Sequence, residues 1–279
     1  MRTPLLMITA VGVCCVPVSA GVQTNSPLGI GFLWTAQSQQ VFSKLNREND
    51  FVDLLLGAGN VDVFKKVKPP VKVSCIALSL EKNKERPFLG LKETIELLRK
   101  NNIPTNRVLL AYNPERHPGT PTPEMDDLLS SARRAQQMAR ADGAPLIIGP
   151  GMKEMMQREQ LYPELAKCCD IWMLQSQRLQ LDEATRKPVE IAVYREEVKR
   201  IVDSLRKGNP NIRIYVQLVT TAERTKVRLT PEQVAAFARS IEQWVDAVRI
   251  YGAPADLLAQ IIDQLRGPSA TASRSGQQK

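Results

Sequence analysis

Short apolar runs alternate with longer amphipathic runs along most of this chain. Beyond residue 27, the short runs are rich in Val, Ile and Leu and are bounded by polar or turn-forming residues, which is typical of buried strands. The pattern predicts eight strands, at residues 28–34, 51–56, 71–79, 107–112, 145–149, 170–175, 212–219 and 247–251.

Between these strands, apolar residues recur at spacings of three and four, the period of a helix that buries one face. The predicted helices span residues 38–45, 61–67, 91–101, 123–142, 152–169, 191–207, 231–244 and 255–265. Two starts carry clear capping signals, Thr122-Pro123-Glu124 and Thr230-Pro231-Glu232. Each places a hydroxyl at the N-cap, proline at the first helical position and an acid in the first turn.

The regular alternation of strand and helix predicts the fold class. Repeated βα units form parallel sheets, and eight units in about 240 residues match the usual length of a closed barrel. We therefore expect an α/β protein with a single (β/α)8 TIM-type barrel over residues 21–266. An open doubly wound sheet is the alternative, but no Gly-x-Gly-x-x-Gly follows the first strand. Residues 267–279 are small, polar and without period, which predicts a disordered tail.

The first twenty residues resemble a signal peptide. Arg2 supplies the positive start, Leu5 to Val16 is almost entirely apolar, and Val18-Ser19-Ala20 offers small residues for cleavage. We expect export to a periplasmic or extracellular location, with a mature chain that begins near Gly21. Lipoprotein processing at Cys14 is the alternative. After cleavage no stable membrane span is expected, because a span needs about 20 apolar residues.

Composition excludes a wholly disordered chain, with 43% hydrophobic and 24% charged residues. Lys and Arg number 38 against 29 Asp and Glu, a formal net charge of +9. The basic residues are interspersed with acids, as on solvated helix faces, so no nucleic-acid partner is expected. The helices show no obvious apolar outer patch, and a monomer is the expectation.

Cysteine and histidine usage argues against a metal site. Beyond the leader, the chain contains Cys75, Cys168 and Cys169, its only histidine is His117, and no Cys-x-x-Cys occurs. Buried free thiols are the favoured interpretation, and a disulfide from Cys75 to one of the vicinal pair stays open as the alternative. No metal or other cofactor is predicted.

In a barrel of this type the carboxyl ends of the strands form the active face. The side chains predicted there are mainly amides and aromatics, with few acids. Amides pair well with sugar hydroxyls, and aromatic rings offer flat apolar faces to pyranoses. The competing interpretation is that the amides bond loop backbone and the aromatics plug the barrel. The candidate ligand-binding residues are Trp34, Tyr112, Asn113, Gln175, Gln177, Gln217 and Tyr251.

The segment Tyr112-Asn113-Pro114-Glu115 resembles the end of the fourth strand in exported (β/α)8 glycoside hydrolases, where the acid/base glutamate follows an asparagine. The resemblance extends over the barrel layout and implies that Glu115 is the general acid. This chain departs from that clan at the end of the seventh strand, where Gln217 occupies the region of the nucleophilic glutamate. Because glycosidases normally use two carboxylates, Glu223 or Glu81 is the candidate second acid.

These observations lead to one functional expectation and two alternatives. We expect an exported barrel that binds or acts on a carbohydrate, or a similar polyhydroxylated ligand, at its strand C-terminal face. If it is an enzyme, it is a glycoside hydrolase. The first alternative is a non-catalytic barrel that serves as a binding or scaffolding module. The second is an envelope protein that attaches to anionic polymers through its positive charge.

Overall fold

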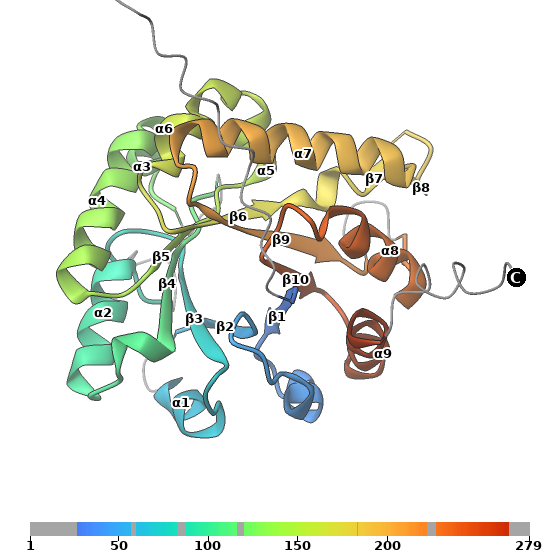
Figure 1. Ribbon diagram of the computed structural model, residues 1–279. Helices are drawn as coiled ribbons and strands as arrows, with labels where there is room; N and C mark the ends of the chain where they lie inside the picture. Colours follow the sequence, from blue (N-terminus) through green and yellow to red (C-terminus); the bar gives the residue numbers. More distant parts are fainter. Residues whose placement is uncertain are drawn as a thin grey trace, which may run out of the picture.

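A computed structural model describes residues 27–56, 60–82, 88–115, 120–182, 184–221 and 227–267. The eight predicted strands all form, at β1 (Gly29–Leu33), β2 (Phe51–Leu55), β3 (Lys72–Ala77), β4 (Val108–Tyr112), β5 (Leu146–Ile148), β6 (Ile171–Gln175), β9 (Arg213–Val219) and β10 (Ala247–Tyr251). Each pairs in parallel with its neighbours, and β1 pairs with β10 to close the barrel (Figure 1). The predicted fold class, a single TIM-type barrel, is confirmed. The predicted leader and residues 268–279 of the predicted tail lie outside the described residues.

Helices surround the barrel in the predicted order, although two predicted helices are interrupted. The long helices are α2 (Leu91–Lys100), α4 (Leu128–Asp142), α7 (Ile191–Gly208), α8 (Pro231–Ile241) and α9 (Ala255–Arg266). The 123–142 range is split into α3 (Thr122–Asp126) and α4, and the 152–169 range into α5 (Met152–Met156), η4 (Glu159–Leu161) and α6 (Tyr162–Ala166). The 3-10 helix η1 (Ser38–Lys44) follows β1, and η2 (Asn60–Asp62) and the short helix α1 (Val63–Lys66) follow β2. The 3-10 helix η3 (Thr105–Arg107) precedes β4, and η5 (Ser176–Arg178) follows β6. A two-stranded sheet, β7 (Leu181–Asp182) with β8 (Lys187–Pro188), was not predicted.

One of the two predicted helix caps is confirmed. Thr230 accepts a hydrogen bond from Gln233 N, and Gln233 completes a capping box at the start of α8. The prediction of Thr122 as an N-cap is wrong, since α3 begins at Thr122 itself after Pro121. The break between α3 and α4 is set by Asp127, whose side chain accepts from Ser130 N and caps α4.

Strand alternation divides the core into two layers. The inner layer fills the barrel and comprises Phe51, Ile76, Leu109, Ala111, Ile147, Ile171, Met173, Tyr215 and Ala247. The outer layer lies between the strands and the helices and is much larger. Within the inner layer, Phe51 and Tyr215 stack with ring centroids 4.9 Å apart. Gly31 leaves room for Phe51, because a Cβ there would lie 2.3 Å from its ring. The barrel is thus packed tightly at this level.

Three aspartates that immediately precede strands cap the strands beside them. Asp50 accepts from Ile30 N at 2.9 Å, Asp170 from Leu146 N at 2.9 Å, and Asp246 from Ile214 N at 2.8 Å. Asp50 is fully buried, also accepts from the N–H groups of Asn46 and Arg47, and forms an ion pair with Arg266 of α9. These contacts satisfy backbone donors at the end of the barrel opposite the predicted active face.

The three cysteines beyond the predicted leader are buried and unpaired. Cys75 lies within β3, and Cys168 and Cys169 follow α6. Burial raises the pKa of both the Cys75 and Cys169 thiols, so they stay protonated and unreactive at neutral pH. The alternative of a disulfide from Cys75 is not what the structure shows.

Asp50→Asn should destabilise the fold by about 3 kcal/mol, because it leaves the charge of Arg266 unpaired and removes one of two acceptor oxygens. Asp263→Asn is the matched control. Asp263 pairs with Lys44 at the surface, at 2.5 Å and with 63% of its side chain exposed, so its loss should change stability by less than about 1 kcal/mol. Urea unfolding followed by circular dichroism measures both. Equal effects of the two substitutions would contradict the capping role of Asp50.

Candidate active site

Inward-facing polar side chains meet at the carboxyl ends of the strands. Alternation along β6 turns Ile171 and Met173 into the barrel, and Gln175 follows them at the strand end. The same alternation places Gln217 of β9 and Arg249 of β10 above the inner layer. Both are more than 90% buried, so their polar groups must be satisfied within the protein.

These groups form a continuous hydrogen-bonded row across the barrel. Arg249 Nη1 donates to Gln217 Oε1 at 2.5 Å, Gln217 Nε2 donates to Gln177 Oε1 at 3.2 Å, and Gln177 Nε2 donates to Gln175 Oε1 at 3.1 Å. Gln175 Nε2 then donates to Glu115 Oε1 at 2.7 Å. We call Asp53, Arg249, Gln217, Gln177, Gln175 and Glu115 the polar row. Its members come from five different strands or the loops that follow them.

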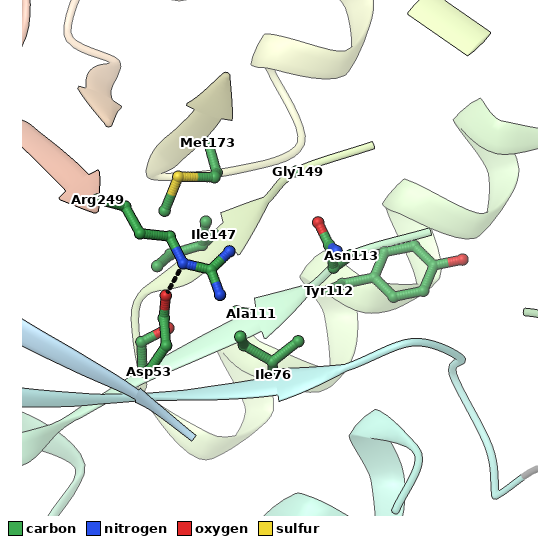
Figure 2. A pocket seen from close by; sticks show the side chains of 10 residues that line it. Asp53, Ile76, Ala111, Tyr112, Asn113, Ile147, Gly149, Met173 and Arg249 are labelled. Carbon is green, nitrogen blue, oxygen red and sulfur yellow. Dashed lines mark ion pairs between the residues drawn. The ribbon is translucent and has the colours of Figure 1, made fainter. Parts of the chain in front are cut away.

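One end of the polar row is a buried ion pair. Arg249 Nε contacts Asp53 Oδ2, and the two side chains are 8% and 1% exposed (Figure 2). Burial raises the pKa of Asp53, and the guanidinium of Arg249 counters part of this rise. The guanidinium also lies 5.4 Å from the ring centre of Tyr251, a cation–π contact. Arg249 is therefore held in place from three sides.

The other end of the row is Glu115, which is half-buried after β4. Its Oε1 accepts from Asn113 Nδ2 and from Gln175 Nε2, each at 2.7 Å. Gln175 Nε2 also lies 2.9 Å from the Gly149 carbonyl and 3.1 Å from Asn113 Oδ1, so the amide is fixed to β4 and β5 together. Two donors on one oxygen orient the carboxyl group, and none of the described residues forms a hydrogen bond with Oε2.

A small cavity lies beside the ion pair. It has about 10 Å³ of space for water centres, which is room for about one ordered water. Its polar lining includes Asp53, Ser74, Asn113 and Arg249, and Figure 2 shows Asn113 and the guanidinium on opposite sides of it. The remaining lining is Ile76, Ala111, Tyr112, Ile147, Gly149 and Met173.

The three aromatic residues predicted at this face differ in burial and in the direction they point. Tyr112 is fully buried in the outer layer, where its hydroxyl donates to Glu124 Oε2 at 2.8 Å, so it offers no ring face to a ligand. The reason is parity: Leu109 and Ala111 of β4 face the barrel interior, so Tyr112 points outward, as Figure 2 also shows. Trp34 is half-buried and lies edge-on against Phe42 at 5.8 Å. Tyr251 is half-buried beside Arg249.

Of the two acids predicted to work with Glu115, only Glu81 lies within the described residues. Glu81 is exposed, with its carboxylate 3.9 Å from Arg134 of α4. Glu223 lies outside the described residues, as does His117.

Sequence reasoning missed two groups that the structure places near the row. Arg249 was overlooked inside an apolar strand, although alternation from Ala247 could have shown that it faces inward. Glu154 of α5 was also overlooked. A Cβ placed on Gly151 would lie 2.5 Å from Glu154 Oε2 and 3.6 Å from Glu115 Cγ, so the two glutamates are neighbours.

The described residues contain neither a metal-binding cluster nor a membrane-spanning helix. No group of three or more His, Cys, Asp or Glu side chains within them is arranged to hold a metal ion. None of the helices described is long and apolar enough to cross a membrane.

Comparison with known proteins identifies the fold and no family. No family model and no curated protein matches the sequence. Among solved structures, β-mannanase from Thermomonospora fusca is 12% identical with a TM-score of 0.53, over 89% of this chain and 91% of the mannanase. Its complex with mannohexaose gives 13% identity and a TM-score of 0.50, again over 89% and 91%. The chain is a TIM-barrel protein with glycoside-hydrolase structures among those that share its fold.

Asp53→Asn should destabilise the protein by about 3 to 5 kcal/mol, because Arg249 would stay buried without a counter-charge. The double variant Asp53→Leu with Arg249→Met should recover most of that loss, since it removes both charges and keeps the volume. Urea unfolding of the wild type and the variants measures the coupling. Loss of less than about 1 kcal/mol in Asp53→Asn would show that the ion pair does not hold this end of the row.

Proposed function

We propose that this protein binds an oligosaccharide at the strand C-terminal face of its barrel and hydrolyses it, with Glu115 as the general acid. The observation that carries the proposal is the fixed position of Glu115 at the end of the polar row. A general acid must hold one oxygen in place and present the other to the leaving group. Asn113 and Gln175 occupy Oε1, so a proton on Oε2 would face the glycosidic oxygen.

The amides of the row supply the chemistry that recognises sugars. Each amide carries both donors and acceptors, and a sugar hydroxyl both donates and accepts. Gln177 is the most accessible of the three glutamines in the row, since Gln175 and Gln217 are 5% and 4% exposed. We expect hydroxyls of a bound sugar to replace the hydrogen bond between Gln177 and Gln217, which at 3.2 Å is the longest in the row.

The aromatic side chains and the fold comparison support the same proposal. Tyr251 and Trp34, both half-buried, provide apolar surface of the kind that packs against pyranose rings. The fold that the chain shares with a β-mannanase is compatible with a carbohydrate ligand.

Glu115→Gln should lower hydrolysis on the order of 10²-fold to 10⁴-fold, because the amide accepts and donates hydrogen bonds but has no acidic proton to transfer. Mannohexaose, cellohexaose and xylohexaose are suitable probes, with new reducing ends measured by chromatography. Glu242→Gln, an exposed acid-to-amide change at the end of α8, is the control and should leave turnover unchanged. Unchanged turnover in Glu115→Gln would remove Glu115 from the mechanism.

A non-catalytic binding barrel is the second candidate, and the state of the site favours it in one respect. The amides of the row satisfy one another, and the cavity beside them has room for about one water. Calorimetric binding of one of these oligosaccharides by the wild type, with no new reducing ends, would establish this candidate in place of hydrolysis.

We also propose that the protein is exported after cleavage of its leader. The supporting observation is the sequence of charge, apolar run and small residues up to Ala20. N-terminal sequencing of the protein recovered outside the cytoplasm should begin near Gly21. A retained Met1 would contradict cleavage, and a lipid-modified Cys14 would establish lipoprotein processing instead.

A further inference from the structure

A groove lies on the outer face of the barrel between α4 and α6, two helices that lie next to each other (Figure 1). It has a volume of about 340 Å³. Because α4 and α6 end where β5 and β6 are about to begin, the groove extends toward the end of the barrel opposite the polar row. One wall comes from α4 and the other from α6 and the residues after it, and the charged and polar lining includes Arg133, Gln137, Arg140, Glu164, Lys167 and Cys168.

The groove carries an excess of positive charge. Its lining contains three cations and one acid, and that acid, Glu164, already pairs with Lys167 at 2.5 Å. Arg133 and Arg140 are exposed, and neither forms an ion pair within the described part of the chain. Two guanidinium groups at the groove therefore have no anionic partner among the residues described.

Both guanidinium groups approach the same point, the thiol of Cys168. This side chain lines the groove although the residue is only 4% exposed, so it forms the bottom of the recess. Burial raises the pKa of the thiol, and the positive charges of Arg133 and Arg140 both counter part of this rise. Each arginine thus lies within electrostatic reach of one sulfur atom. An anion bound above Cys168 would be within reach of both.

The two walls are joined by a direct contact. Gln136 Nε2 of α4 donates to the Lys167 carbonyl at 2.8 Å, which ties α4 to the end of α6. Cations near helix C-termini are favoured by the helix dipole, and this accounts for Arg140 and Lys167. It does not account for Arg133, which lies in the middle of α4. A structural role for its charge is therefore not evident, whereas a ligand would give it one.

From these contacts we infer that the groove binds a small soluble phosphate ester, with the dianionic phosphate between Arg133 and Arg140 above Cys168. Guanidinium groups donate paired hydrogen bonds to phosphate oxygens. Gln137, exposed on α4 between the two arginines, offers an amide to hydroxyls of the esterified group. The groove is separate from the polar row, so binding here is independent of the proposed hydrolysis.

The shape of the groove favours a small ligand over a membrane surface. The phosphate has to enter a recess whose bottom is a nearly buried thiol, and a flat bilayer would reach only the rim. None of the described lining residues carries a large apolar side chain that could insert among lipids.

Calorimetric titration of the whole protein with glycerol 3-phosphate, at physiological ionic strength, tests the site. We expect saturable binding of one molecule per chain, and no binding of glycerol. Arg133→Gln and Arg140→Gln should each weaken binding on the order of 10-fold to 100-fold, because each removes charged donors to the phosphate. Arg133→Lys keeps the charge but loses the paired donors, so it should also weaken binding. Glutamine is a good helix former, and circular dichroism should be unchanged.

Arg134→Gln is the matched control, since it makes the same change at the next residue of α4. Arg134 is exposed and lies 3.9 Å from Glu81, so this variant should bind like the wild type. Absence of binding by the wild type would overturn the site. An equal loss in Arg134→Gln would do the same, because it would indicate diffuse charge attraction. Binding to phosphatidylglycerol vesicles without binding of glycerol 3-phosphate would also overturn it, in favour of a membrane surface.

Discussion

Pairing of the first strand with the last closes the sheet, and the arrangement of every polar group at the candidate site depends on this closure. β1 pairs with β10 over four residues, from Gly29 with Ala247 to Phe32 with Ile250. A closed parallel barrel turns all eight carboxyl strand ends to one face, so side chains distant in the sequence become neighbours. Asp53 and Arg249 lie on β2 and β10, the two strands that flank β1. They meet only because β1 pairs with both strands and completes the ring.

The polar row connects the barrel interior to the candidate catalytic acid through a chain of hydrogen bonds. Its inner end is an ion pair that is nearly inaccessible to water, where a displaced partner leaves a charge buried and uncompensated. Its outer end is Glu115, held by two amide donors. Each amide in the row donates to the next and accepts from the one before, so the orientation of one determines the orientation of its neighbour. The row is least accessible to solvent at the ion pair and more accessible at Gln177.

Much of the fold was predictable from the sequence because strand burial and helix period leave a strong signal. All eight strands were located, and the inward position of Gln175 and Gln217 follows from alternation with Met173 and Tyr215. Prediction failed at Tyr112 because of strand parity and at Glu154 because of a tertiary contact. Tyr112 was assigned to the ligand face, but the strand parity of Ala111 turns it outward onto Glu124. Glu154 could not be found, because its approach to Glu115 depends on the contact of Gly151 with Pro114.

Side-chain NMR signals of the polar-row amides report whether these amides form a carbohydrate-binding surface. Gln177 and Gln217 amide resonances can be assigned by single substitution to Glu and followed as mannohexaose, cellohexaose or xylohexaose is added to Glu115→Gln, which we expect to bind without turnover. At least one oligosaccharide should shift the side-chain amide signals of Gln177, Gln217 and Asn113 together in a saturable manner. Binding that leaves these signals unmoved, or no binding by any of the three, would contradict it.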